Sequence, residues 1–225
     1  SDAYLCDKAL WDSAQNQLKN AVIKADLNYF EQEGEAAFYG PKIDFMATDA
    51  IGREHQVATV QLDFVQPERF ELEYSGEGGV VGRPVMIHCA LLGSIERFLS
   101  VYIEHTAGKF PVWCAPEQLR IIKVKDDPAV DSLCADIMKL AQTNGVRALL
   151  DDSNNSVGKK IRNAEVMKVP YSIVVGDKEA ESGLLPLRIR ADLAVNNDSD
   201  KSYEPEQLMR SIANEARARA SKSSI

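Results

Sequence analysis

Polar side chains interrupt two apolar stretches of the sequence at positions where they could bind a ligand. Gln56, Thr59 and Gln61 alternate with valine and leucine residues, which is typical of a strand with one buried face. Tyr39 and Lys42 flank a Gly-Pro turn just before another β-rich run. Amide, hydroxyl and ammonium groups on one face of a curved sheet can hydrogen-bond a polar ligand. This pattern predicts a binding surface for a polar small molecule.

An imidazole and a guanidinium form a second candidate group. His88 follows the apolar run 85–87, and Arg97 lies one turn into a helical pattern that Ser94 opens as a potential N-cap. Arginine binds phosphate through two hydrogen bonds or stacks on a base. A lone strand histidine is more often a hydrogen-bonded core residue, and an arginine on a helix is often a surface ion pair. Spacing alone leaves these alternatives open, but we expect His88 and Arg97 to line the same hollow.

The elements that must position these residues are short strands between two helices. Apolar residues recur at three- and four-residue steps over residues 10–25, which predicts a helix. Alternating or β-rich runs and Gly-rich turns follow and predict an antiparallel sheet. The predicted strands of this sheet are residues 42–47, 55–64, 70–74 and 84–90. A second helix begins at about residue 94 and ends near Gly108.

The pattern changes in the second half of the chain. Strands and helices alternate there, which favours βαβ units and a mixed sheet of five strands covered by helices. We therefore place a domain boundary between residues 115 and 116, so that domains 1–115 and 116–225 are α+β and α/β, respectively. The predicted strands are residues 119–124, 146–150, 171–175 and 185–190, with helices at 128–144, 157–168 and from 205 onward, a turn at 176–177 and a loose loop at 192–202.

Composition excludes several classes of protein. Residues 1–115 carry nine basic and seventeen acidic side chains and residues 116–225 carry seventeen of each, so no overall basic surface marks a nucleic-acid-binding protein. The four cysteines lack a CxxC spacing, which favours free thiols in a reducing compartment, the cytoplasm. Apolar runs are too short to span a membrane, and no signal peptide is visible.

Four ordered blocks identify a family resemblance. Residues 38–43 (FYGPKI), 59–64 (TVQLDF) and 85–98, which contain VMIH and GSIERF, strongly resemble the threonyl-tRNA synthetase family. The last block resembles the third signature motif of class II synthetases. Residues 169–179, with VPY and GDKE, are similar to the anticodon-binding domain of that family. Each block alone is weakly specific, but their combination and order are highly specific.

The resemblance implies both an activity and a missing part. The family activates threonine with ATP as threonyl-adenylate and transfers it to tRNA(Thr), as a homodimer and with Mg²⁺ bound to ATP. Motifs one and two, the editing domain and two zinc ligands lie upstream of the part that corresponds to this chain. We therefore expect a truncated chain or a proteolytic product that contains the second half of the catalytic domain and the anticodon-binding domain. We expect this chain to be inactive alone.

The resemblance also assigns roles to residues of the first half. His88 matches the third zinc ligand, and because one imidazole cannot hold zinc, the chain is expected to retain little metal. Arg97 matches the motif-three arginine that contacts ATP. Tyr39, Lys42, Gln56 and Gln61 match catalytic-site residues that contact substrate or adenylate. The ATP-binding set implied by the resemblance comprises Arg97, Gln56, Thr59 and Ser94.

In the second half, the matching positions are those that read anticodon bases. Glu179 and Arg188 are the main candidates, with Asn154 and Arg162 in support, because carboxylates and guanidinium groups recognise bases exposed in single-stranded loops. Basic residues on or near the helix 157–168 form a potential phosphate patch, although a solvated charged face is the alternative. These basic residues are Lys159, Lys160, Arg162 and Lys168.

Three positions depart from the family pattern. Cys89 and Ala191 replace expected arginines, and Ser156 replaces a commonly basic residue, so we expect fewer phosphate contacts and an altered charge near the substrate. Two other hypotheses remain. One is a natural non-catalytic module that binds tRNA or a protein through residues 116–225. The other is a generic α/β ligand-binding protein. An upstream reading frame that carries motif two would distinguish the fragment from the module.

Overall fold

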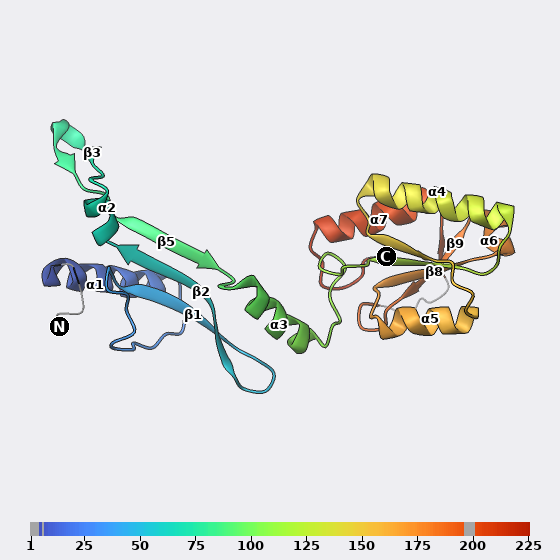
Figure 1. Ribbon diagram of the computed structural model, residues 1–225, viewed down its shortest axis with the longest axis horizontal. Helices are drawn as coiled ribbons and strands as arrows, with labels where there is room; N and C mark the ends of the chain where they lie inside the picture. Colours follow the sequence, from blue (N-terminus) through green and yellow to red (C-terminus); the bar gives the residue numbers. More distant parts are fainter. Residues whose placement is uncertain (1–4, 6, 196–200) are drawn as a thin grey trace. The chain divides into compact units, whose positions relative to one another are not determined.

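The computed structural model describes residue 5 and residues 7–195 and 201–225. The chain divides into two compact units, Ser1–His105 and Thr106–Ile225 (Figure 1). The sequence-based boundary between residues 115 and 116 is later than this division. Residues just before that boundary pack on the second unit, because Arg147 donates hydrogen bonds to the carbonyl oxygens of Trp113 and Ala115.

The first unit is built on an antiparallel sheet of three strands, as its alternating pattern predicts. The strand order is β1-β2-β5, so β2 is central. Lys42 of β1 pairs with Gln61 of β2, and Gln61 pairs in turn with His88 of β5. The polar residues of the three strands are thereby brought side by side. The strands are β1 (Lys42–Thr48), β2 (Glu54–Asp63) and β5 (Met86–Leu91).

Three helices flank this sheet. Helix α1 (Lys8–Lys24) begins at Asp7, whose carboxylate accepts hydrogen bonds from the first-turn backbone, as expected for an N-cap. Helix α2 (Val65–Arg69) follows β2 directly and was not predicted from the sequence. Helix α3 (Ile95–Thr106) follows β5 and carries Arg97. The predicted helices at 10–25 and from 94 onward are therefore present.

The predicted strand at residues 70–74 is wrong. The chain turns after α2, because Glu71 has a φ of +52° and cannot continue an extended strand. Only β3 (Tyr74–Ser75) is extended there, and it pairs with β4 (Val81–Gly82) across the short 3₁₀ helix η1 (Glu77–Gly79). The alternating apolar and acidic residues at 70–74 therefore belong mostly to a loop, and they reach only the start of a hairpin whose strands have two residues each.

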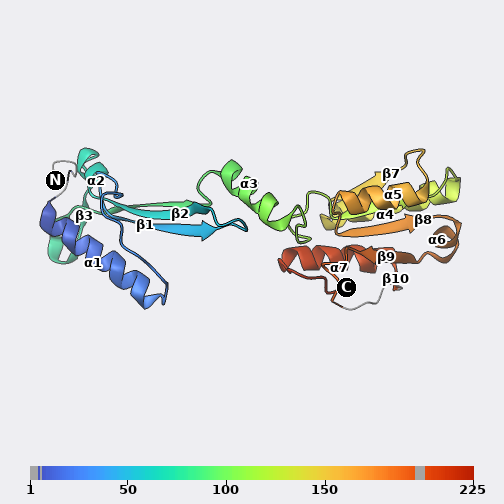
Figure 2. The same ribbon diagram turned by 90° about the horizontal axis from the view of Figure 1, so that it is seen from below.

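The second unit contains the predicted mixed sheet of five strands. The strand order is β10-β9-β8-β6-β7. Strand β6 is parallel to β7 and β8, and β8 and β9 are antiparallel, as are β9 and β10. Figure 2 shows β7, β8, β9 and β10 one after another across this sheet. The strands are β6 (Leu119–Lys123), β7 (Ala148–Asp151), β8 (Tyr171–Val175), β9 (Leu185–Ile189) and β10 (Ser202–Tyr203).

Local signals set the ends of the helices in this unit. Helix α4 (Pro128–Asn144) starts after the N-cap Asp127 and stops at Gly145, which has a φ of +72°. The helices α5 (Val157–Val166) and α7 (Pro205–Arg217) match the predictions within a few residues. The predicted turn at 176–177 is instead the start of helix α6 (Asp177–Ser182). Part of the predicted loop at 192–202 lies outside the described residues.

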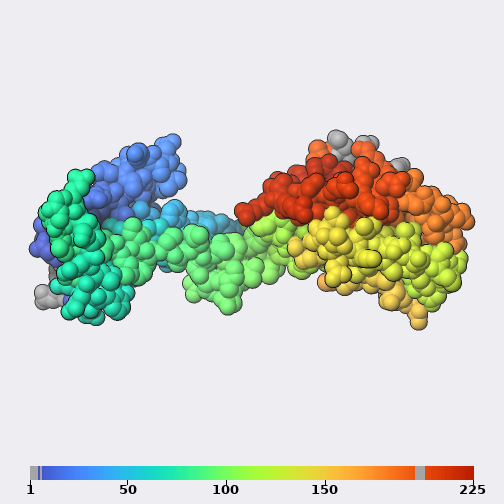
Figure 3. All heavy atoms as spheres, turned by 90° about the horizontal axis from the view of Figure 1, so that it is seen from above, coloured from blue at the N-terminus to red at the C-terminus, as the bar shows by residue number. Residues whose placement is uncertain are grey.

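The core of the second unit lies between the sheet and the helices α4 and α7, which lie side by side (Figure 3). Tyr171, Ile173 and Val175 of β8 alternate onto this buried face. The hydroxyl of Tyr171 donates to the buried carboxylate of Glu215 at 2.8 Å and contacts the hydroxyl of Ser223 at 2.7 Å. This polar network attaches the C-terminal residues to the core.

Candidate functional site

A β-bulge aligns the polar residues of the first unit on one face. Val57 has no partner on β1, whereas Gln56 pairs with Met46 and Thr59 pairs with Asp44. Because directly paired residues share a face and the bulge adds one residue, Gln56 and Thr59 lie on the same face although three positions separate them. A regular strand would place them on opposite faces. The bulge therefore completes the predicted polar surface.

Hydrogen bonds connect most side chains of this polar face. The hydroxyl of Tyr39 donates to Gln61. The carboxylate of Asp44 forms an ion pair with Lys42 at 2.6 Å and accepts a hydrogen bond from the Gln56 amide at 2.8 Å. Five candidate residues of the sequence analysis are thus close to one another: Tyr39, Lys42, Gln56, Thr59 and Gln61.

Thr59 has an unusual environment on this face. Its hydroxyl oxygen is buried and has no hydrogen-bond partner among the described residues. Buried hydroxyl groups are almost always hydrogen-bonded, because an unpaired one costs about 1–3 kcal/mol. Among the described residues, the Thr59 hydroxyl is therefore a polar group of this face whose hydrogen bond the protein itself does not supply.

His88 lies on the same face, opposite Gln61. Its Nε2 is 2.9 Å from the buried carboxylate of Asp63, and its ring lies edge-on to that of Tyr39 with 5.8 Å between centroids. Burial by itself would raise the pKa of Asp63, but hydrogen bonds from the Gln66 backbone, from His88 and from the Val65 backbone lower it. Asp63 was not predicted as a site residue.

That His88 and Arg97 line the same hollow stays a prediction. Arg97 lies with Gln56 and Phe98 at a narrow hollow between β2 and α3, whereas His88 pairs with Gln61 further along β2. The guanidinium of Arg97 is exposed and makes no ion pair with any residue in the described part of the chain. Ser94 accepts a long hydrogen bond of 3.4 Å from the Arg97 backbone, which supports its predicted role as an N-cap.

Cys89 lies on the other face of the sheet. Consecutive strand residues point to opposite faces, and Cys89 pairs with Val60 rather than with a polar residue. A charged side chain at position 89 would therefore lie on the face opposite to the polar residues, and the effect of Cys89 on the charge near the substrate stays a prediction. The side chain at this position belongs to the apolar face.

In the second unit, three anticodon-binding candidates lie on one side of the sheet. Arg188 pairs with Ser172, so it points away from the buried face that Tyr171 occupies, toward the side covered by α5 (Figure 1). Arg162 is exposed on α5, and Asn154 is exposed in the turn that precedes this helix. The side chains of all three residues are exposed on this side of the sheet.

Glu179 lies elsewhere, at the carboxyl end of β8. Its carboxylate accepts a hydrogen bond of 2.9 Å from the backbone N–H of Gly176 and thereby caps helix α6. One carboxylate oxygen is therefore used within the protein. Glu179 and Arg188 come from opposite ends of the strand pair β8–β9.

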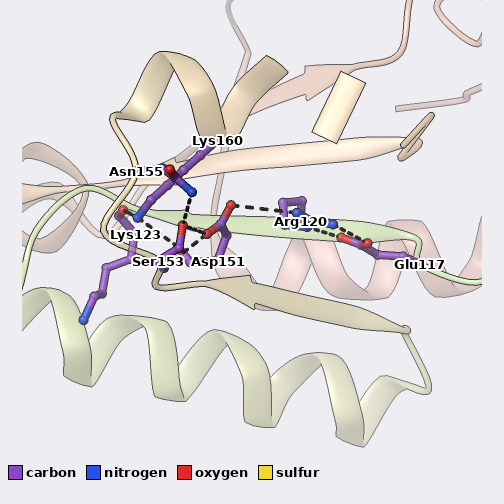
Figure 4. Close-up of polar contacts among 7 residues, drawn as sticks. All are labelled: Glu117, Arg120, Lys123, Asp151, Ser153, Asn155 and Lys160. Atoms are coloured by element: carbon purple, nitrogen blue, oxygen red, sulfur yellow. Dashed lines mark hydrogen bonds and ion pairs between the residues drawn. The ribbon is translucent and has the colours of Figure 1, made fainter. Parts of the chain in front are cut away.

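Lys160 is not part of a phosphate patch. Its side chain is 3% exposed, and its ammonium group donates to the carbonyl oxygens of Lys123 and Asp151, at 2.8 and 3.2 Å. It joins the carboxyl ends of β6 and β7 (Figure 4). The prediction for Lys160 is therefore wrong, whereas Lys159 on the same helix is exposed.

Next to Lys160, a polar network that the sequence analysis missed extends along the same strands (Figure 4). Arg120 binds Glu117 through two hydrogen bonds and lies 3.8 Å from Asp151. Asp151 accepts hydrogen bonds from the hydroxyl and the backbone of Ser153. The pairs Arg120–Glu117 and Asp151–Ser153 are local in the sequence, but the contact between Arg120 and Asp151 that joins them links two strands, and no local pattern indicates it.

Two family models match the chain, one in each unit. Residues 7–106 match the tRNA synthetase class II core domain (G, H, P, S and T), and residues 118–212 match an anticodon binding domain. The chain therefore belongs to the class II aminoacyl-tRNA synthetases.

Curated relatives specify the branch of this class. The chain is 48% identical over 207 residues to the threonine–tRNA ligase of Gloeobacter violaceus, with 91% of this chain and 32% of the relative covered. It is 41% identical over 216 residues to that of Thermotoga maritima, with 96% and 33% covered. The chain spans about a third of the length of these relatives. The resemblance to the threonyl-tRNA synthetase family is thereby confirmed.

Solved structures confirm the fold class. The RNA binding domain of threonyl-tRNA synthetase from Cryptosporidium parvum Iowa II matches with a TM-score of 0.82 and 34% identity, over 94% of this chain and 52% of that chain. A putative threonyl-tRNA synthetase from Aeropyrum pernix matches with a TM-score of 0.71 and 29% identity, over 98% of this chain and 52% of that chain. The antiparallel sheet followed by a mixed sheet is therefore the arrangement of known synthetase domains.

Proposed function

We propose that this chain forms part of a threonine–tRNA ligase, in which its first unit lines the aminoacylation site and its second unit reads the anticodon. The observation that carries the proposal is the presence of the polar face of β1, β2 and β5 and an anticodon binding domain in one chain. The complete ligase would form threonyl-adenylate from threonine and ATP and transfer the threonyl group to tRNA(Thr). We propose that the complete ligase is cytoplasmic and forms a homodimer. In the described residues, no helix could span a membrane.

The polar face offers complementary groups for an adenylate. The Gln56 and Gln61 amides and the Thr59 hydroxyl would hydrogen-bond its polar groups, and Tyr39 and Lys42 would form the wall beside them. Arg97, whose guanidinium is exposed and free of ion pairs in the described residues, would neutralise phosphate charge of ATP, with Mg²⁺ bound to the nucleotide.

Among the described residues, His88 fits one position of a zinc site. His88 offers an imidazole that a buried carboxylate orients, which is the usual environment of a zinc ligand. In the part of the chain that the structure describes, no group of three His, Cys, Asp or Glu side chains could hold a metal ion. We therefore propose that His88 supplies one ligand of a zinc site that further residues complete. A bound zinc ion would act as a Lewis acid that prefers the threonine hydroxyl over a methyl group.

Recognition of tRNA can be tested on the second unit. We expect the 225-residue chain to bind an anticodon stem-loop of tRNA(Thr) more tightly than a stem-loop with altered anticodon bases. Arg188→Ala should weaken the cognate complex on the order of tenfold, because the guanidinium can hydrogen-bond or stack on a splayed base. Fluorescence anisotropy titrations at fixed ionic strength measure both effects.

Arg210→Ala is the matched control, because Arg210 is exposed on α7 and its loss removes the same charge from the other side of the sheet. Equal affinity for cognate and altered stem-loops would contradict the proposal. If R188A and R210A lose the same affinity for the cognate stem-loop, Arg188 contributes only general electrostatic attraction to the RNA.

Catalysis gives a separate test. The chain alone should show no threonine-dependent exchange of pyrophosphate into ATP, because the family resemblance places motif two and two zinc ligands outside it. Pyrophosphate exchange by purified chain would overturn the expectation that this part is inactive alone. Binding without exchange is the outcome that the proposed function requires.

A further inference from the structure

The carboxylate of Asp63 uses both of its oxygens. The side chain is fully buried, and Oδ1 accepts hydrogen bonds from the backbone N–H groups of Val65 and Gln66, both at 2.9 Å. The other oxygen, Oδ2, lies 2.9 Å from Nε2 of His88. The two backbone donors therefore hold the carboxyl group in one orientation, with Oδ2 toward the imidazole.

This geometry determines which nitrogen of His88 carries the proton. An ionised carboxylate only accepts hydrogen bonds. The two backbone N–H groups that donate to Oδ1 favour the ionised form of the Asp63 carboxyl group. Nε2 of His88 must therefore donate, and in a neutral imidazole the lone pair then belongs to Nδ1.

The remaining surroundings of His88 leave Nδ1 available. Nδ1 has no hydrogen bond with a residue in the described part of the chain, and the side chain is 37% exposed. The ring edge of Tyr39 restricts how the imidazole can lie. One nitrogen is thus fixed against a buried acceptor while the other remains accessible from the polar face.

We propose that Asp63 is a positioning residue that holds His88 as the Nε2–H tautomer, so that Nδ1 is the nitrogen with which His88 binds its ligand. The inference rests on the proposed function in that it names the ligating atom of the same site. A carboxylate behind a histidine fixes the tautomer and raises the basicity of the free nitrogen, which favours an electron-pair acceptor such as zinc. Asp63 acts through His88 and does not itself contact the ligand.

The first unit contains a matched pair that serves as a control. Asp49 accepts hydrogen bonds from the backbone N–H groups of Ile51 and Arg53 through Oδ1, and its Oδ2 lies 3.0 Å from Nε2 of His55. This arrangement resembles that of Asp63 and His88, except that Oδ2 of Asp49 also accepts a hydrogen bond of 2.6 Å from Nε of Arg53, and it lies outside the row of candidate residues on the polar face. The chain has only three histidines, so their imidazole signals can be assigned individually.

The test is the tautomer of each histidine in the ¹⁵N-labelled 225-residue chain, measured from long-range ¹H–¹⁵N spectra near neutral pH. We expect His88 to favour Nε2–H on the order of tenfold or more, as a hydrogen bond to a charged acceptor implies. In Asp63→Asn, the backbone donors retain Oδ1 and place the amide Nδ2–H against His88. Nε2 must then accept, so His88 should change to the Nδ1–H tautomer.

Asp49→Asn should change the signals of His55 and leave those of His88 as in the wild type. A wild-type His88 that is Nδ1–H or an even mixture of tautomers would overturn the proposal whether or not the variant folds. An unchanged tautomer in a folded D63N chain would also overturn it. The spectra need neither tRNA nor threonine, so a chain that fails to bind tRNA but shows Nε2–H contradicts only the proposed function.

Discussion

Asp151 is the acidic centre of the network at the carboxyl ends of β6 and β7. Burial by itself would raise its pKa, but hydrogen bonds from the Ser153 hydroxyl and backbone, together with the charges of Lys160 and Arg120, lower it below its usual 3.8. A carboxyl group whose pKa is lower in the folded state stabilises the fold in its ionised form. This contribution is complete above the ordinary pKa and is lost as the pH falls through the folded-state pKa.

We therefore expect Asp151→Asn to lower the free energy of unfolding of the second unit at neutral pH by about 1–2 kcal/mol, because hydrogen bonds to a charged acceptor are lost. The deficit should begin to shrink as the pH falls below the ordinary pKa of the carboxyl group and should vanish below the lower folded-state pKa, where wild-type Asp151 is protonated as well. Urea unfolding at several pH values measures it. Asp152→Asn is the control, because Asp152 is exposed, and a deficit independent of pH would contradict the argument.

At the scale of elements, helix α6 depends on one side chain at its start. Gly176 is the N-cap and has no side chain of its own, so the carboxylate of Glu179 satisfies its backbone N–H. The same residue is a candidate for reading anticodon bases. The cap and the reading role require different properties of Glu179, which allows them to be separated.

Glu179→Gln should preserve the cap, because a side-chain carbonyl oxygen can still accept the Gly176 hydrogen bond, while Glu179→Ala should destabilise the second unit by about 0.5–2 kcal/mol. Both variants should weaken binding of the cognate stem-loop if the carboxylate accepts from a base amino group. Thermal unfolding and anisotropy titrations provide the two readouts. If E179Q binds the cognate stem-loop as tightly as the wild-type chain does, Glu179 caps helix α6 but does not read a base.

At the scale of the molecule, the two units differ in how much apolar surface they bury. The main core cluster comes entirely from the second unit, in residues between Val112 and Ala213. In the described part of the first unit, the buried apolar side chains are Ala14, Val65 and the prolines Pro41 and Pro67, and Leu91 on β5 is 76% exposed. Burial of apolar surface is the main favourable term in folding, so the first unit is the less stable one.

We expect hydrogen exchange of backbone amides to report this difference directly. Amides of β6 and β8 should exchange slowly and at a common rate set by unfolding of the second unit, whereas amides of β1, β2 and β5 should exchange at least tenfold faster. Mass spectrometry of peptides after timed labelling measures both sets in one sample. Equal protection of β2 and β8 would show that burial within each unit does not determine its stability.

Local sequence patterns predicted most of the helices and strands, because periodic apolar residues and capping residues lie close together in the sequence. Helices α1, α4 and α7 follow from periodic apolar residues and caps. The first sheet follows from alternating polar and apolar residues, and the second follows from strands that alternate with helices along the chain. The family follows from motif blocks in a fixed order. These features depend on neighbours within a few positions, and the sequence displays those neighbours directly.

The tertiary structure decided the features that depend on partners distant in the sequence. The bulge at Val57 arises from the pairing of β1 with β2, and it places Gln56 beside Thr59. The partner of His88 is Asp63 on the adjacent strand, and Lys160 is buried where its ammonium group binds carbonyl oxygens at the ends of β6 and β7. Strand register and the direction in which a helix faces are set by packing over the whole unit. Local residue types could therefore name the candidates but could not decide which of them lie together.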